Sequence, residues 1–328
     1  MHFSIIVPVY NSANFLAECL TALKESAYPD TEIIVVDDAS TDNAALVAAR
    51  AGVKFVQLAR NSGPATARNY GARYATGEIL FFVDADVVLA PNALNRIEKA
   101  FQEEPDLAAI FGSYDAYPKA SGIISQYRNL LHHYVHQNGN CDASTFWAGC
   151  GAIRRFVFEE LGGFDEKQFP RSSIEDIELG YRLRRSGYRI RLDKFLQGTH
   201  LKQWTLLSWI RTDILSRALP WSRLIVETKM LPNDLNLRWH QRVSFVLVTL
   251  ACLFMTLGMF RIELTIIAAI ALSVMLVLNR GIYFFFLRQR GLLFALACIP
   301  LHILYYLYSG FTYLYIRTGF LLRRIAVL

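Results

Sequence analysis

The sequence predicts an α/β protein in which a mostly parallel sheet is followed by interfacial helices and then by transmembrane helices. Apolar segments alternate with helix-like segments over residues 1–110, which is the pattern of a parallel sheet covered on both faces. The last third contains an uncharged run of 18 residues at 243–260, close to the length that crosses a bilayer. We therefore expect three parts, which are a catalytic-type domain at 1–200, amphipathic interfacial helices at 201–242 and a transmembrane region at 243–328.

Polar side chains follow the predicted strands of the first part. Asn11 comes after the first strand, Asp37 and Asp38 come after the second, and Asp84 and Asp86 end the fourth. Because such sheets bind ligands at the carboxyl ends of their strands, we expect a site there. The expected strands are 3–10, 31–40, 53–59 and 78–86, and the expected helices are 11–26, 42–52 and 64–77, the last of them ended by Gly77.

Residues 111–200 show a less regular pattern. The segment SSIEDIELGYRLRRSGYRI, at 172–190, predicts a loop that enters a helix, a stop at Gly187 and then a strand. In 201–242, tryptophans interleave with arginines and lysines, as in segments that lie at a membrane interface.

The apolar tail predicts two or three membrane spans. Residues 243–260 and 292–316 are each long enough to cross, with Pro300 as the expected kink in the second. Between them, 264–278 is apolar but is interrupted at 279–281. This middle segment is either a full span or a shorter span followed by a helix in the interface.

The net charge of +6 comes from the later parts of the chain. Residues 200–242 carry seven basic and three acidic side chains, whereas acids exceed bases in 1–199. A cationic zone beside apolar spans favours an anionic membrane leaflet or lipid headgroup, so nucleic acid is not an expected partner. Five cysteines without a CxxC pair indicate a reducing compartment. The first residues, MHFSIIVPVYNS, predict a strand and no signal peptide, so we expect a multi-pass protein of the cell membrane with its first domain in the cytoplasm.

Two carboxylates stand directly behind the fourth strand. Asp84 and Asp86 are separated by one small residue, so both can offer oxygens to one hard cation such as Mg²⁺ or Mn²⁺. Acidic residues at strand ends are also common as solvated turn residues, and the motif alone does not decide between these interpretations.

Three companion features favour the metal and nucleotide interpretation. The pair at 37–38 provides two more carboxylates at the same edge of the sheet. Arg60 and Arg68 flank a Gly-Pro turn that enters a helix, which suits an anionic or nucleotide ligand. Glu175 and Asp176 begin another helix, where acidic residues also stabilise the helix dipole.

Six motifs, taken together and in their order along the chain, resemble those of the inverting glycosyltransferases of family 2. These enzymes have the GT-A fold, which is a Rossmann-like sheet with flanking helices. The resemblance covers roughly residues 3–195. The motifs are VPVYN, VVDDASTD, RNSGPATARN, FFVDAD, GGFDE and EDIELGYRLRRSGY.

The resemblance implies that a nucleotide-diphosphate sugar binds at the strand ends. Asp38, with Asp37 beside it, would hydrogen-bond the base, and Arg68 would contact the nucleotide. The residues implied in nucleotide binding are Pro8, Tyr10, Asn11, Asp37, Asp38, Arg68 and Asp84.

The resemblance also assigns the chemistry. Asp86 would bind Mg²⁺ or Mn²⁺ directly, and Asp84 would reach the ribose or a metal-bound water. Asp176 would be the general base, supported by Glu175. A metal neutralises the departing diphosphate, and a carboxylate takes the proton of the attacking hydroxyl. His200 would add a metal or diphosphate contact, unless it is an ordinary surface histidine.

The acceptor would lie near the segment FWAGCG, where the family lines its acceptor cavity with residues such as Trp147 and Gly149. Core packing is the other interpretation of Trp147. The segment RALPW at 217–221 departs from the QxxRW motif of processive members, so we expect single transfers. The histidines at 132, 133 and 136 lack an HExxH pattern and are interpreted as an exposed helix face or an acceptor contact.

The resulting hypothesis is a metal-dependent inverting glycosyltransferase that moves a sugar to a lipid or lipid-linked acceptor, such as a polyprenyl phosphate, at the cytoplasmic membrane face. The alternative is a membrane-bound sensor or scaffold that binds a nucleotide sugar without transfer. A nucleotidyltransferase is less consistent with the sequence, because no Gly-rich basic loop follows the first strand. The donor sugar, its base and the acceptor stay open.

Overall fold

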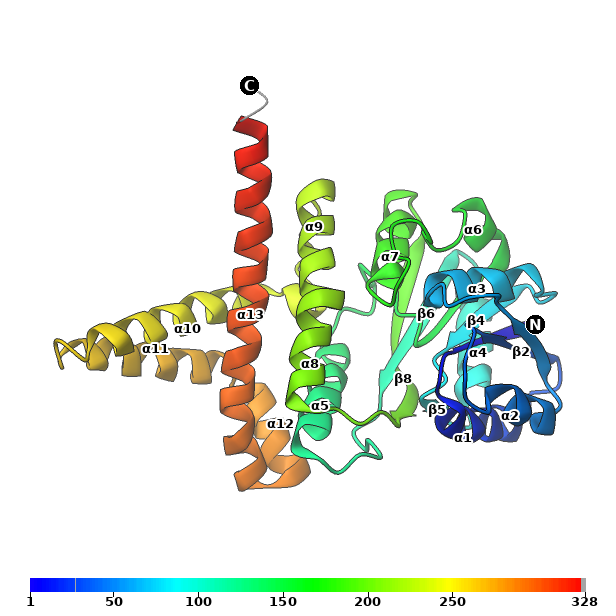
Figure 1. The fold of residues 1–328 in the computed structure, drawn as a ribbon, viewed down its shortest axis with the longest axis horizontal. Coiled ribbons are helices and arrows are strands. Elements are labelled where there is room, and N and C mark those ends of the chain that lie inside the picture. Colours follow the sequence, from blue (N-terminus) through cyan, green and yellow to red (C-terminus); the bar gives the residue numbers. More distant parts are fainter. Residues whose placement is uncertain (27, 326–328) are drawn as a thin grey trace. The chain divides into compact units, whose positions relative to one another are not determined.

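The computed structural model describes all of the chain except residues 27 and 326–328 (Figure 1). The chain divides between residues 204 and 205 into two compact units. The separate assignment of 201–242 to interfacial helices remains a prediction.

The first unit is built on an eight-stranded mixed sheet with the order β3-β2-β1-β4-β7-β6-β8-β5. Strands β1 to β4 pair in parallel, whereas β7 runs antiparallel to both β4 and β6. β8 is parallel to β6 and antiparallel to β5. The strands are β1 (Phe3–Val9), β2 (Thr31–Asp37), β3 (Lys54–Gln57), β4 (Ile79–Val83), β5 (Val87–Leu89), β6 (Leu107–Tyr114), β7 (Cys150–Arg154) and β8 (Arg189–His200).

Helices cover both faces of this sheet (Figure 1). Every residue of β4 is buried, which explains why its sequence is a continuous apolar run instead of an alternating one. The helices are α1 (Ala13–Glu25), α2 (Ala44–Ala51), α3 (Pro64–Arg73), α4 (Ala93–Glu103), α5 (Ile123–Gln137), α6 (Arg155–Glu160) and α7 (Glu175–Arg185).

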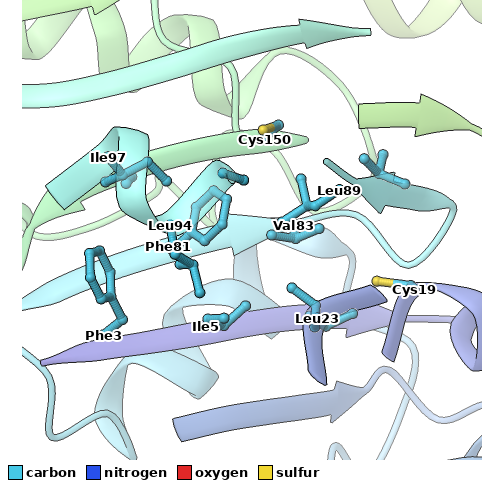
Figure 2. Packing of buried hydrophobic residues seen from close by; sticks show 14 of the residues in the cluster. Phe3, Ile5, Cys19, Leu23, Phe81, Val83, Leu89, Leu94, Ile97 and Cys150 are labelled. Atoms are coloured by element: carbon cyan, nitrogen blue, oxygen red, sulfur yellow. The ribbon is translucent and has the colours of Figure 1, made fainter. Parts of the chain in front are cut away.

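The main core lies between the sheet and one helical layer. Burying an aromatic side chain such as Phe81, which is 0% exposed, stabilises the fold by about 1.5–3 kcal/mol. The cluster therefore fixes the strands whose ends carry the polar side chains. Figure 2 shows its members Phe3, Ile5, Cys19, Leu23, Phe81, Val83, Leu89, Leu94, Ile97 and Cys150.

The structure confirms the predicted α/β fold, and the first four strands lie where the sequence places them. The sheet is mixed because β5 and β7, which had no clear pattern in the sequence, are inserted antiparallel to their neighbours. The helix expected at 64–77 ends earlier, at Arg73. Its predicted stop, Gly77, instead donates its N–H to the Ser4 hydroxyl at 2.8 Å, which ties the following turn to β1.

The second unit is helical. Its segments are α8 (Leu206–Thr212), a π-helical segment (Asp213–Ala218), α9 (Leu219–Thr228), a 3₁₀ turn (Leu235–Leu237), α10 (Trp239–Leu257), α11 (Leu264–Leu278), α12 (Arg280–Arg290) and α13 (Leu292–Ile325). α10 and α11 lie side by side (Figure 1). Val248, Met275 and Tyr306 form a buried cluster where these two helices meet α13.

Within the described residues, two helices are long and apolar enough to cross a membrane. These are Trp239–Leu257 and the segment Leu292–Arg323 of α13. α11 and α12 pass the same test only as a pair, and the chain bends by 68° between them. The break falls at Asn279, whose buried amide donates to the Ser244 hydroxyl at 2.7 Å and accepts from the Tyr306 hydroxyl at 2.8 Å.

Candidate active site

A pocket of about 350 Å³ opens at the carboxyl ends of β1, β2 and β4. This is the edge at which parallel α/β sheets bind ligands. Its walls carry both basic and acidic groups, as a site for a charged phosphate ligand and a cation requires. The lining residues are Pro8, Val9, Tyr10, Ser12, Asp38, Asn61, Gly63, Pro64, Ala67, Arg68, Asp84, Ala85, Asp86, Arg171, Ser172 and Lys202.

Arg68 is the buried centre of the site. It lies on α3, and its side chain is 6% exposed. Its guanidinium donates to Asp84 Oδ1 at 2.7 Å and to Glu175 Oε1 at 2.9 Å. Burial by itself would lower the pKa of Arg68, but the charges of Asp84, Glu175 and Asp176 raise it. The structure therefore holds a permanent positive charge between the strand-end acid and the start of α7.

Asp176, next to this ion pair, has the properties of a general base. Burial, followed by the charge of Glu175, raises the pKa of its carboxyl to about 6. Its Oδ2 accepts from the Ala148 N–H at 3.1 Å, and its Oδ1 accepts from its neighbour Ile177 N–H at 2.8 Å. A base with a pKa near neutrality is better matched to proton transfer than an ordinary aspartate.

Asp86 and His200 come together because β5 and β8 pair, with Val87 opposite His200. His200 Nε2 lies 3.5 Å from Asp86 Oδ2. Burial opposes the ionisation of Asp86, but the hydrogen bond and charge of His200, with help from Lys202, lower the pKa of Asp86 overall. His200 is 6% exposed, so it is not a surface histidine.

These two side chains suit a divalent cation, whereas Asp84 is less available. One oxygen of Asp84 is engaged by Arg68, and no cluster of three or more His, Cys, Asp or Glu side chains is assembled for a metal within the described residues. A cation held by Asp86 and His200 would complete its coordination shell with substrate oxygens, as Mg²⁺ commonly does.

Asp38 lines the pocket and also shapes it. Its Oδ1 accepts from the Ser62 N–H at 2.7 Å, and its Oδ2 accepts from the Gly63 N–H at 2.8 Å and the Asn61 amide at 3.0 Å. Burial raises the pKa of Asp38 despite these bonds. Both carboxylate oxygens therefore hold the loop that leads into α3, and any contact to a base uses the same atoms.

Asp37 and Asn11 are not among the residues that line the pocket. Asp37 is buried and accepts from the Ser40 N–H at 3.0 Å and the Gln57 amide at 2.7 Å. Asn11 accepts from the Thr41 N–H at 2.8 Å. These contacts connect the loops after β1 and β2, so both residues order the pocket without being among its lining residues.

Pro8 and Tyr10 line the pocket at the end of β1. The Tyr10 side chain is 49% exposed. An exposed aromatic ring at a pocket offers a flat apolar face on which a base can stack.

The segment predicted to bind the acceptor lies beside Asp176. Trp147 is half-buried, and its ring meets the Tyr114 ring at 4.9 Å in an edge-on arrangement. Gly149 leaves room for this ring, since a Cβ at 149 would lie 2.6 Å from Trp147 Cε2. The Ala148 N–H that bonds Asp176 comes from the same segment.

The helix with three histidines is not an exposed face. His136 is 7% exposed, and its ring lies 3.9 Å from that of His132 between centroids. Tyr114 stacks on His200 at 4.3 Å and contacts the His132 ring at 4.4 Å. A row of rings thus leads from Asp86 into the interior of the first unit.

Sequence reasoning missed Lys202, Arg171, Asn61 and Tyr114. Lys202 and Arg171 line the pocket from loops with no regular pattern. Asn61 and Gly63 lie within the motif RNSGPATARN, in which only the arginines were predicted to contact the ligand. Tyr114 ends β6, a strand that the sequence did not reveal.

Known proteins share the first part of the chain. Residues 4–162 match the sequence family described as Glycosyl transferase family 2. Glycosyltransferase GlyG of Streptococcus pneumoniae is 32% identical over 124 residues, which are 36% of this chain and 41% of that protein. Poly(ribitol-phosphate) beta-N-acetylglucosaminyltransferase TarS of Staphylococcus aureus is 41% identical over 93 residues, 26% of this chain and 16% of that protein. The match thus spans less than half the length of either relative.

A solved structure has the same fold. Mannosyltransferase PcManGT from Pyrobaculum calidifontis, in complex with GDP-Man and Mn²⁺, superposes with a TM-score of 0.54 at 20% identity, covering 97% of this chain and 86% of that chain. This similarity confirms a GT-A-type fold.

Proposed function

Because residues 4–162 form a glycosyl transferase family 2 domain, we propose that the protein is a metal-dependent inverting glycosyltransferase. It would move a sugar from a nucleotide-diphosphate sugar to a lipid or lipid-linked acceptor at the cytoplasmic face of the membrane. The observation that carries this proposal is the placement of Asp176, a carboxyl with a pKa of about 6, beside the buried ion pair that borders the strand-end pocket.

In the proposed reaction, Asp176 removes the proton of the acceptor's attacking group, an alcohol hydroxyl or a monoprotonated phosphate. The oxygen of that group then bonds to the anomeric carbon as the bond from this carbon to the diphosphate breaks. A single base without a covalent partner yields inversion. Arg68 holds Glu175 at the start of α7, and this would fix the position of the neighbouring Asp176. The Ala148 N–H orients one of its oxygens.

The donor would occupy the pocket with its base near Tyr10 and Asp38. Lys202 and Arg171 line the same pocket, and they supply the positive charge that a diphosphate requires. Asp86 and His200 would hold Mg²⁺ or Mn²⁺, which supplies neutralisation of the leaving diphosphate. The PcManGT structure contains GDP-Man and Mn²⁺, which supports a donor of this class.

The acceptor assignment depends on the second unit. Its helices that are long and apolar enough to cross a membrane, together with the basic and aromatic residues before them, favour an acceptor drawn from the membrane surface. The relative TarS is named for poly(ribitol-phosphate), so a soluble polymer acceptor must be compared directly.

The test is release of nucleoside diphosphate from the donor when it is incubated with the purified protein in lipid micelles. The donor panel includes GDP-mannose and UDP-GlcNAc, with Mn²⁺ or EDTA, and the acceptors are polyprenyl phosphate, diacylglycerol and poly(ribitol phosphate). We expect metal-dependent release that one lipid acceptor stimulates. Stimulation by the polymer alone would overturn the lipid acceptor. Nucleotide binding without release for every combination would favour the sensor or scaffold.

A further inference from the structure

The second unit contains a pocket of its own, with a volume of about 360 Å³. This is within the usual range for small-molecule sites. The π-helical segment and α9 form one wall, the start of α10 forms another, and the middle of α13 forms the third. Rare π-helical segments frequently mark functional sites.

The pocket combines aromatic walls with two arginines. Trp221, Phe245 and Tyr313 are among its lining side chains, together with Arg217 and Arg242. An apolar interior with a few polar groups suits a ligand that has a hydrocarbon portion and a charged end.

Arg242 is positioned but is not neutralised. Its Nε donates to the Leu237 carbonyl at 2.9 Å, and Nη2 lies 3.5 Å from the Pro232 carbonyl. In the part of the chain that the structure describes, it forms no salt bridge with a carboxylate. Its charge is therefore available to an anion, and the two carbonyls direct the guanidinium.

Arg217 is held only weakly by its neighbour. Its Nη1 lies 3.9 Å from Asp213 Oδ1, which is long for a charge-assisted hydrogen bond. The other oxygen of Asp213 accepts from Trp209 Nε1 at 2.8 Å and from the Tyr308 hydroxyl at 2.7 Å. These two donors hold Asp213 in place, and the long contact from Arg217 to Oδ1 leaves the half-exposed guanidinium able to reach a second anion.

Both arginines lie next to segments that suit a bilayer. Arg242 is in the first turn of α10, and α10 and α13 are each long and apolar enough to cross a bilayer. Basic and aromatic side chains at the end of an apolar helix are typical of the headgroup level.

We propose that this pocket binds an anionic membrane phospholipid, with its phosphate on Arg217 and Arg242 and one hydrocarbon chain against Trp221 and Phe245. Charge complementarity selects an anionic headgroup over a zwitterionic one. The proposal does not depend on the proposed transfer reaction, because each of its observations lies in the second unit.

Brominated lipids test this directly, because bromine quenches tryptophan fluorescence on contact and Trp221 lines the pocket. The full chain in phosphatidylcholine nanodiscs is prepared with increasing fractions of brominated phosphatidylglycerol or brominated phosphatidylcholine. The part of the tryptophan fluorescence that is lost in Trp221→Phe is the signal of the pocket, and this comparison separates it from the signals of the other tryptophans. We expect the fraction of brominated phosphatidylglycerol that half-quenches this component to be at least tenfold lower than the corresponding fraction of brominated phosphatidylcholine.

Variants locate the effect. Arg217→Gln with Arg242→Gln should raise the half-quenching fraction of phosphatidylglycerol about tenfold. Arg223→Gln, an exposed arginine of α9 that does not line the pocket, is the matched control and should change nothing. Ser309→Phe should fill the pocket and remove the saturable quenching. Equal quenching of the wild-type Trp221 component by the two lipids would overturn the proposal whatever the arginine variants show, and so would an unchanged signal in Ser309→Phe.

Discussion

Arg68 donates a 2.9 Å hydrogen bond to Glu175, although the two residues are 107 positions apart in the chain. Their side chains are 6% and 5% exposed. The pair connects α3 to the first residue of α7, and so it connects one wall of the pocket to the proposed base that follows Glu175. The Arg68 guanidinium is therefore expected both to stabilise the fold and to position the proposed base.

Replacing Arg68 with Met should destabilise the protein by about 3–5 kcal/mol, because it leaves Glu175 buried without a counter-charge. Thermal unfolding of the full chain in detergent measures this change. Arg73→Met, on the same helix but with a side chain 69% exposed, is the control and should cost less than about 0.5 kcal/mol. Equal melting temperatures for the two variants would contradict a central role for the Arg68 pair.

The sequence predicts the early strands and their acidic ends because the signal there is local. The five apolar residues of β4 run directly into Asp84, and parallel pairing brings neighbouring strand ends to one edge. The same reasoning misses β7, since CGAIR is short and its partners, β4 and β6, are distant in sequence. It also misses Tyr114, whose importance arises only when β6 and β8 pair and His200 comes beside it.

The sequence also does not reveal which residue of a motif faces the pocket. Asp37 and Asp38 are adjacent and chemically identical. Asp38 nevertheless lines the pocket, whereas Asp37 accepts a hydrogen bond from the Ser40 N–H in the loop after β2. Successive residues at the end of a strand point to opposite sides, so only the pairing of β2 decides which one faces the ligand.

The proposed base predicts a pH profile. The pKa of Asp176 is raised from its ordinary value to about 6, and a base works only when it is deprotonated. Activity, measured as kcat/KM, should therefore be full above pH 7 and fall tenfold for each pH unit below about 6. Asp176→Asn should reduce kcat at pH 7.5 by a factor of about 10² to 10⁴ and retain nucleotide binding.

The control for this profile is Asp142→Asn. Asp142 forms a salt bridge at 2.8 Å with Arg184, which lies on α7 as Asp176 does. Unlike Asp176, it is exposed, and it does not line the pocket. It should keep both the rate and the pH dependence. A wild-type profile that stays flat down to pH 5 would rule out Asp176 as the base.

Tyr114 is expected to position His200 for metal binding. Its ring stacks on His200 at 4.3 Å with an interplanar angle of 17°, so a phenyl ring can replace it but a methyl group cannot. Titration of Mn²⁺ in the presence of a nucleoside diphosphate, followed by electron paramagnetic resonance, should give an unchanged Kd for Tyr114→Phe and a Kd about tenfold higher for Tyr114→Ala. Equal loss in both variants would assign the effect to the hydroxyl and not to the stack.

Gly63 tests whether the loop held by Asp38 is required for nucleotide binding. Its φ is +87°, and a Cβ there would lie 2.7 Å from the Pro170 carbonyl oxygen, so Gly63→Ala meets both backbone strain and a backbone clash. We expect it to lower stability by at least about 1–3 kcal/mol and to weaken nucleotide binding, because the Gly63 N–H would move away from Asp38. Gly187→Ala separates the two causes, since Gly187 has a φ of +83° but no atom within 4 Å of an added Cβ. Gly187→Ala should be destabilised by strain alone and should bind nucleotide normally in calorimetry. Equal nucleotide binding by Gly63→Ala and Gly187→Ala would show that the loop after β3 is not needed for the ligand.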